Sequence, residues 1–228
     1  MGFFTVKANE ENVRDYSGDS AFINKSGMYE ITIKALIVDQ TKNGSQVLNL
    51  WFTYKEKDQM IYQAIRMTNN DGSPNVRGHE LLTKLGVVAS GTSSGEFEID
   101  DPVSMMLPVG KDGEEKECMV LDQFCNVPIH IHVRMEYSLY EGKIRENKLI
   151  HNFFRYEDKA TASEIVNNSE TKGSQYEKEE ASITTKYKDD LTEEDVQNWI
   201  KERRSGKKEE EKKPSNGFGQ KRTFGKKS

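Results

Sequence analysis

Residues 28–38 read MYEITIKALIV, and this stretch decides the kind of fold that the chain can form. Polar residues at Glu30, Thr32 and Lys34 alternate with apolar ones. The apolar positions are Tyr29, Ile31, Ile33, Ala35 and Ile37. Successive side chains of a β-strand point to opposite faces, so an alternation with a period of two predicts a half-buried strand.

Two further strands are predicted directly after this one. Residues 41–44, TKNG, contain the Asn-Gly pair that favours a tight β-hairpin turn. The next strand is 46–55, QVLNLWFTYK, in which Leu48, Leu50 and Phe52 share one face. A polar break then leads to a third strand at 59–68, QMIYQAIRMT. Short turns between consecutive strands predict an antiparallel meander.

A helix is predicted after the meander. Residues 69–78 are rich in Asn, Asp, Gly and Pro, which is typical of turns. Residues 77–87, RGHELLTKLGV, place three leucines on one side of a short helix, with Gly86 as its stop. Residues 89–117 have the composition of a long loop.

The second half of the body adds two or three strands. Residues 118–125 allow a strand, while 128–140, PIHIHVRMEYSLY, and 144–155 predict a hairpin. The predicted order is three strands, a helix and then further strands. This is the order of an all-β, five-stranded OB-type barrel, whose helix lies between its third and fourth strands. Other small barrels and sandwiches share these features and remain open.

The composition changes near Glu157. Residues 157–200 hold twelve acidic and five basic side chains, whereas 201–228 hold four acidic and eleven basic ones. Such segments bury too little apolar surface to fold alone. The chain is therefore expected to divide into a binding domain, a polar flexible linker, a short amphipathic helix and a basic tail rich in Gly, Phe and Lys. Their ranges are 1–156, 157–190, 191–205 and 206–228.

The predicted helix after the linker carries clear end signals. Thr192 is a good N-cap, and acidic residues fill the first turn. Val196, Trp199 and Ile200 would form one apolar stripe. A helix of this length is marginal alone in water, so the stripe either docks on its own body or binds a partner protein. The basic tail beyond it suits contacts with single-stranded nucleic acid or merely aids solubility.

Trp51 is the strongest candidate for contact with nucleic acid. The alternation places it with Lys55 on the polar face of its strand, where a ring can stack on a base and a lysine can hold a phosphate. The polar faces of the other strands would add further rings and cations. The candidates are Lys34, Trp51, Lys55, Tyr62, Arg66, His132 and Arg134. In the alternative interpretation, Trp51 is covered by the loop that follows the helix.

Metal binding and catalysis find little support. His130 and His132 share a strand face, but Cys118 and Cys125 are spaced too widely for a typical zinc site and suit small core positions. The chain has no phosphate-binding loop and no nucleophile elbow. Residues 146–148, Glu-Asn-Lys, have the Glu-x-Lys spacing of some nucleases without an upstream Pro-Asp. We expect a non-enzymatic protein with no metal and no cofactor.

Several stretches resemble a known group of proteins. They are FFTV at 3–6, YSG at 16–18, SGMYEITI at 26–33 and TKNGSQVLNL at 41–50. Their pattern and order are similar to those of bacteriophage single-stranded-DNA-binding proteins from recombination and replication gene clusters. The resemblance covers 1–156 and implies an OB fold, binding without sequence specificity, and no catalysis. The resemblance does not assign a role to any individual residue of this chain. The end GKKS differs from the acidic tip of bacterial single-strand binders.

These observations give one expected function and one alternative. The chain is expected to bind single-stranded DNA in phage replication or recombination, with partner proteins recruited through the tail. The alternative is a non-enzymatic β-domain adaptor that uses the C-terminal helix. Two cysteines and no long apolar run favour a soluble protein of a reducing compartment, the host cytoplasm if a phage encodes it, with no membrane contact.

Overall fold

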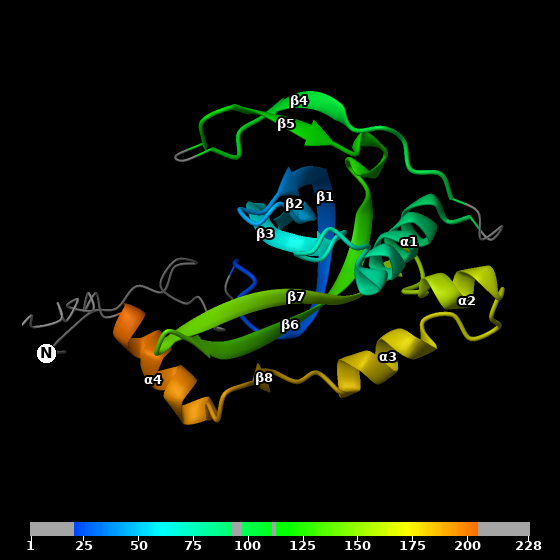
Figure 1. Cartoon of the computed structure of the whole chain (residues 1–228). Helices are drawn as coiled ribbons and strands as arrows, with labels where there is room; N and C mark the ends of the chain where they lie inside the picture. The colour runs from blue at the N-terminus through cyan, green and yellow to red at the C-terminus, as the bar shows by residue number, and fades with distance from the viewer. Residues whose placement is uncertain (1–20, 93–96, 111–112, 205–228) are drawn as a thin grey trace, which may run out of the picture.

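The structure, a computed structural model, describes residues 21–92, 97–110 and 113–204 (Figure 1). Its strands are β1 (Gly27–Gln40), β2 (Gln46–Tyr54), β3 (Lys57–Arg66), β4 (Val103–Leu107), β5 (Lys116–Val120), β6 (Pro128–Tyr140), β7 (Lys143–Arg155) and β8 (Lys186–Tyr187). Its α-helices are α1 (Val76–Ser90), α2 (Ala162–Val166), α3 (Ser174–Ala181) and α4 (Glu193–Arg204). The three meander strands, the first helix, the later hairpin and the last helix lie where the sequence predicts them.

The strands form one mostly antiparallel sheet. Hydrogen bonds connect β3 to β2, β2 to β1, β1 to β6 and β6 to β7. The second half of β1 also pairs with β5, which pairs with β4, and the short β8 runs parallel to β6. Within the described residues no ladder joins β3 to β7. The sheet is therefore open at this seam, and the closed five-stranded barrel expected from the sequence is not seen.

A β-bulge at Lys34 reorganises β1. The register with β2 shifts between Ile33 and Ala35, so one extra residue enters the strand. Because side chains alternate, an inserted residue exchanges the two faces beyond it. Ile31, Ile33 and Leu36 consequently lie in the main core, whereas Ala35 and Ile37 lie in a second cluster. The prediction that all the apolar residues of β1 share one face is therefore wrong after Ile33.

The hairpin of β4 and β5 was not expected from the sequence. It occupies most of the region predicted to be a loop and runs over β1 and β2 at the top of Figure 1. Leu107 and Val120 bring its apolar side chains onto the second cluster. The predicted strand at 118–125 corresponds to the end of β5 and to a short 3₁₀ helix, Asp122–Phe124.

Helix α1 extends beyond its predicted stop. Asn75 caps its N-terminus by accepting a hydrogen bond from the Gly78 amide, and the helix ends before Gly91. Gly86 lies inside the helix, where a Cβ atom would come within 2.4 Å of the Phe97 ring. This glycine therefore permits close packing of Phe97 and does not end the helix.

Residues 156–192, here called the strap, are folded against the body rather than forming the expected flexible linker. The strap contains α2, α3 and β8 and runs along the β6–β7 hairpin (Figure 1). Ile165 and Tyr176 are buried, and the Lys188 ammonium lies 2.6 Å from the buried carboxylate of Glu136 on β6. Composition alone misses these contacts because they are few and partly polar.

Helix α4 docks on its own body. Thr192 caps it as predicted, receiving a hydrogen bond from the Asp195 amide. Val196 is 1% exposed, and the Trp199 ring meets the Tyr137 ring edge-on at 6.3 Å. Ile200 also packs against the main core. The stripe that was a candidate for partner binding therefore packs on the protein's own sheet, with Trp199 and Ile200 partly buried.

Some of the stretches that the sequence singles out lie near the two ends of the chain. The FFTV and YSG stretches and the basic tail at 206–228 lie outside the described residues. Among the residues that are described, none of the helices combines the length and the apolar character needed to cross a bilayer.

Glu164 is the main polar anchor of the strap. Its carboxylate accepts hydrogen bonds from the amides of Thr161 and Gln175 and from the Ser174 hydroxyl, and so ties α2 to the start of α3. Burial raises the pKa of this carboxyl, but these hydrogen bonds outweigh burial and hold the pKa below its ordinary value of 4.5.

The Glu164→Ala variant is expected to lose about 1–3 kcal/mol of strap stability, because hydrogen bonds to a charged group are removed. The contribution of Glu164 is complete above its unfolded-state pKa of 4.5 and is lost as the pH falls through the lower folded-state value. Hydrogen exchange of residues 160–181 at pH 7 and pH 4 measures both effects. Glu170→Ala, at an exposed glutamate nearby, is the control; equal exchange in the two variants would contradict the assignment.

Candidate nucleic-acid interface

A groove of about 710 Å³ lies between β3, the first turn of α1 and β7. Its wall includes Tyr62 from β3, a residue that is 68% exposed. The side chains that carry positive charge into the groove are Arg66, Arg77 and Lys148. One exposed aromatic ring beside three cations is the combination that stacks a base and holds phosphates.

A second bulge, on β3, presents Tyr62 to solvent. Leu48 pairs with Ile65 and Leu50 pairs with Ile61, so the β3 segment between them is longer than its β2 partner. Within it, Gln63 adopts a left-handed backbone with φ of 50°. The buried side chain of Asn49 stabilises this shape by accepting a hydrogen bond of 2.7 Å from the Gln63 amide. The buried Asn49 side chain thus holds the β3 bulge that exposes the Tyr62 ring.

Close packing of α1 on β3 brings the arginines to one groove. A Cβ atom on Gly78 would lie 1.8 Å from the backbone oxygen of Arg66, so only glycine permits this approach. Arg77 therefore enters beside Arg66, whose guanidinium is held by Gln63 at 2.9 Å and by Asn70 at 3.1 Å. These hydrogen bonds leave the arginine oriented before any ligand binds.

The acidic side chain of the groove wall is hydrogen-bonded to a neighbouring tyrosine. Glu146 on β7 accepts a hydrogen bond from the buried Tyr137 hydroxyl. Burial and this carboxylate together raise the pKa of Tyr137 to about 12, so the phenol remains a donor at neutral pH. Three cations against one carboxylate leave the groove wall with a positive balance.

Two of the groove residues were predicted and two were not. Tyr62 and Arg66 are among the seven candidates from the sequence, and both line the groove. Arg77 sits at the start of a helix, and Lys148 had been considered only as part of the Glu-x-Lys spacing. Their positive charge was visible in the sequence, but their meeting depends on how α1 and β7 pack.

Trp51 does not lie on an open face. It is 9% exposed and belongs to the second cluster with Leu107 and Val120 of the β4–β5 hairpin. The prediction of an exposed stacking platform is wrong for this residue, and the alternative of a covered tryptophan holds. Lys34 lies 5.0 Å above the Trp51 ring and 2.8 Å from Asp58.

The remaining candidate cations do not join the groove wall. Lys55 is exposed in the β2–β3 turn, with its ammonium 5.4 Å from the Tyr54 ring. His132 is 6% exposed beneath the strap, and Arg134 on the same strand has a buried Nε atom. The strap covers the polar face of β6, so the single concave surface predicted from all seven residues does not form.

His132 is part of a small polar cluster under the strap. Its Nδ1 atom lies 2.8 Å from Glu179 on α3, whose other carboxylate oxygen accepts hydrogen bonds from Asn152 and Gln175. Burial raises the pKa of Glu179, but these hydrogen bonds outweigh it and keep the pKa below the ordinary value. Burial is the main cause that lowers the pKa of His130.

The structure does not assemble the zinc ligands considered from the sequence. Cys118 and Cys125 are free thiols that pack against the second cluster around Trp51, and burial raises the pKa of each. His130 instead stacks on Tyr156, with ring centroids 5.9 Å apart. In residues 21–92, 97–110 and 113–204, the one group of three His, Cys, Asp or Glu side chains close enough to share a metal is His132, His151 and Glu179.

Comparison with protein-family models and with curated proteins gives no match.

Replacing Trp51 separates a structural role from a stacking role. Trp51→Ala is expected to cost about 3–5 kcal/mol of unfolding free energy, because a large buried ring is lost. Below its unfolding transition, the variant should bind oligo-dT as tightly as the wild type. Urea unfolding and fluorescence anisotropy measure the two effects. A large loss of affinity at unchanged stability would restore Trp51 as a stacking residue.

Proposed function

We propose that this protein binds single-stranded DNA without sequence specificity, using the groove between β3, α1 and β7. The observation that carries the proposal is the exposed Tyr62 ring beside Arg66, Arg77 and Lys148 in one groove. An aromatic side chain stacks on the face of any base, and cations contact the backbone that all sequences share. The groove therefore suits binding to DNA of any sequence.

The order of the strands supports the proposal. The path β3-β2-β1-β6-β7, with α1 between β3 and β6 along the chain, has the same order as an OB-type barrel. In that fold, the face of the second and third strands binds oligonucleotides. Tyr62 and Arg66 lie on β3, the third strand of this path. An OB-like arrangement would place the groove at the seam between β3 and β7.

The biological setting of the proposal comes from the resemblance to phage single-strand binders. Protection of single strands during phage DNA replication or recombination, in the host cytoplasm, requires binding and no catalytic group. In this proposal Lys148 of the Glu-x-Lys spacing, which lines the groove beside Glu146, contacts the DNA backbone.

Tyr62→Ala is the direct test of the stacking contact. Loss of one base–aromatic stack is worth about 1–3 kcal/mol, so the affinity for oligo-dT should fall by about 5- to 150-fold. Fluorescence anisotropy at low salt measures the change. Tyr156→Ala, at a tyrosine that is 43% exposed and lies outside the groove wall, should change the affinity little. A wild-type protein that does not bind at low salt would refute the proposed function.

The three cations predict the salt dependence of binding. Contact with three phosphates of a single strand gives a slope of about −2 for log K against log salt. Lys148→Ala should reduce this slope by about 0.7. Lys178→Ala, on the exposed side of α3, is the matched control. If both variants kept the wild-type slope, Lys148 would not contact phosphate and the groove would be assigned wrongly.

A further inference from the structure

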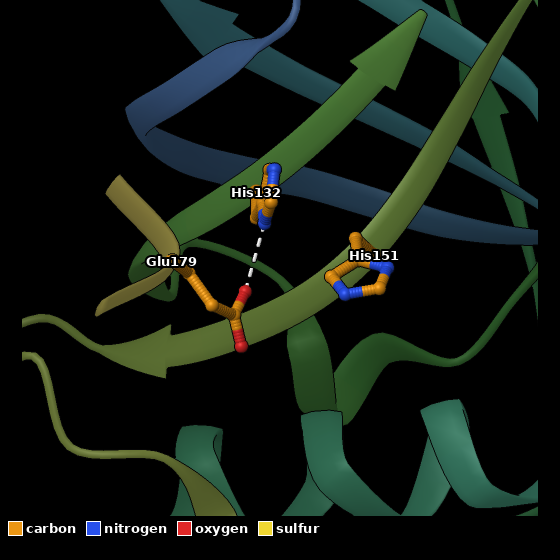
Figure 2. A group of neighbouring side chains, drawn as sticks. All are labelled: His132, His151 and Glu179. Atoms are coloured by element: carbon orange, nitrogen blue, oxygen red, sulfur yellow. Dashed lines mark hydrogen bonds and ion pairs between the residues drawn. The ribbon is translucent and has the colours of Figure 1, made fainter. Parts of the chain in front are cut away.

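The cluster of His132, His151 and Glu179 brings together three elements that are distant in the sequence. His132 belongs to β6, His151 to β7 and Glu179 to α3 of the strap. One ligand atom from each residue can be chosen so that all lie within 4.8 Å of one another. Figure 2 shows the two rings and the carboxylate converging on one small region between the hairpin and the strap.

A β-bulge places His151 in this cluster. His132 pairs with Asn152, while Val133 pairs with Ile150, so His151 is the extra residue of β7. In a regular ladder its side chain would point to the opposite face from His132. The bulge re-aims it, and the two imidazole rings meet edge to face with centroids 4.9 Å apart.

The other two ligands are held in place before any ion enters. Glu179 is 8% exposed, and hydrogen bonds from Asn152 at 2.9 Å and Gln175 at 3.2 Å orient its carboxylate. The Nδ1 atom of His132 points at this carboxylate, while its buried Nε2 atom has no hydrogen-bond partner among the described residues. The ring is thus oriented from its Nδ1 side alone.

We propose that His132, His151 and Glu179 form a site for a divalent transition metal ion, with zinc as the best match. Two imidazole nitrogens and one carboxylate oxygen are a ligand set that zinc accepts in three-ligand sites, where a water molecule takes the fourth position. A neutral His132 ring that binds the ion through Nδ1 releases its Nδ1 proton to solvent and takes one up on Nε2, and the carboxylate charge offsets half of the charge of the ion. Because His151 is exposed, solvent reaches the fourth position.

The position of the site gives the ion a mechanical role. It would cross-link α3 to both strands of the β6–β7 hairpin and so clip the strap onto the body. This role is independent of the groove, because none of the three ligands lines it. An experiment can therefore disprove metal binding without disproving DNA binding, and the reverse.

The test uses the full-length, chelator-treated protein without a polyhistidine tag. Titration with Co²⁺, followed by visible absorption, is expected to show one ion per chain in a site from which Zn²⁺ displaces it. Hydrogen exchange of residues 174–181 should slow when Zn²⁺ is present. This second measurement reports on the strap and distinguishes the site from an ion held elsewhere on the surface.

The decisive variant is His151→Gln, because its exposed side chain can change without loss of the fold. Its Co²⁺ affinity should fall by at least about 100-fold, since loss of even an outer hydrogen-bond partner costs about 10- to 100-fold. His79→Gln changes another exposed histidine, on α1, and should leave the affinity unchanged. Equal metal affinity in the two variants, or no binding by the wild type above the level of His151→Gln, would overturn the proposal.

Discussion

The arrangement of the whole molecule depends on the β-bulge at Lys34 in β1. Before the bulge β1 pairs with β6, and after it β1 pairs with β5, while β2 accompanies the strand on its other side. The bulge also exchanges the faces of β1, so that Leu36 enters the main core and Ile37 enters the second cluster. Because Lys34 is inserted, β1 contributes apolar side chains to both the main core and the second cluster. The β4–β5 hairpin and its coverage of Trp51 follow from that division.

Both faces of the sheet are largely covered, and this restricts where a ligand can bind. The β4–β5 hairpin covers the outer face of β2, and the strap covers the polar face of β6. Exposed surface with aromatic and cationic character remains at the seam between β3 and β7. Tyr62 reaches solvent there because Asn49 holds the bulge in β3, so a buried amide determines the position of the ring that the proposed function requires.

Regular alternation and helix end signals were sufficient to predict β1 to β3, the β6–β7 hairpin and α4, because these features depend on neighbouring residues. The three bulges, in β1, β3 and β7, were not predictable in this way, since the polar and apolar pattern of each strand does not mark the inserted residue. The strap was predicted to be a flexible linker because its composition is acidic and poor in apolar residues. It packs on the body partly through polar contacts, such as that of Glu179 with His132, which composition does not reveal. Arg77 and Lys148 reach the groove only through the packing of α1 and β7, so their positive charge in the sequence did not reveal their meeting.

The parallel pairing of β8 covers part of the outer edge of β6. Beyond Gly27, where β1 begins, the outer edge of β6 would be free to pair with another molecule. Instead the Met135 amide donates to the Ser26 hydroxyl, the Tyr137 carbonyl accepts from the Lys188 amide, and the Leu139 amide donates to Asp189. An unpaired strand edge is a template for aggregation. The acidic segment after residue 156 thus covers the free edge of β6. A fragment that ends at residue 156 would expose this edge, and its unpaired backbone groups could pair with a strand of another molecule.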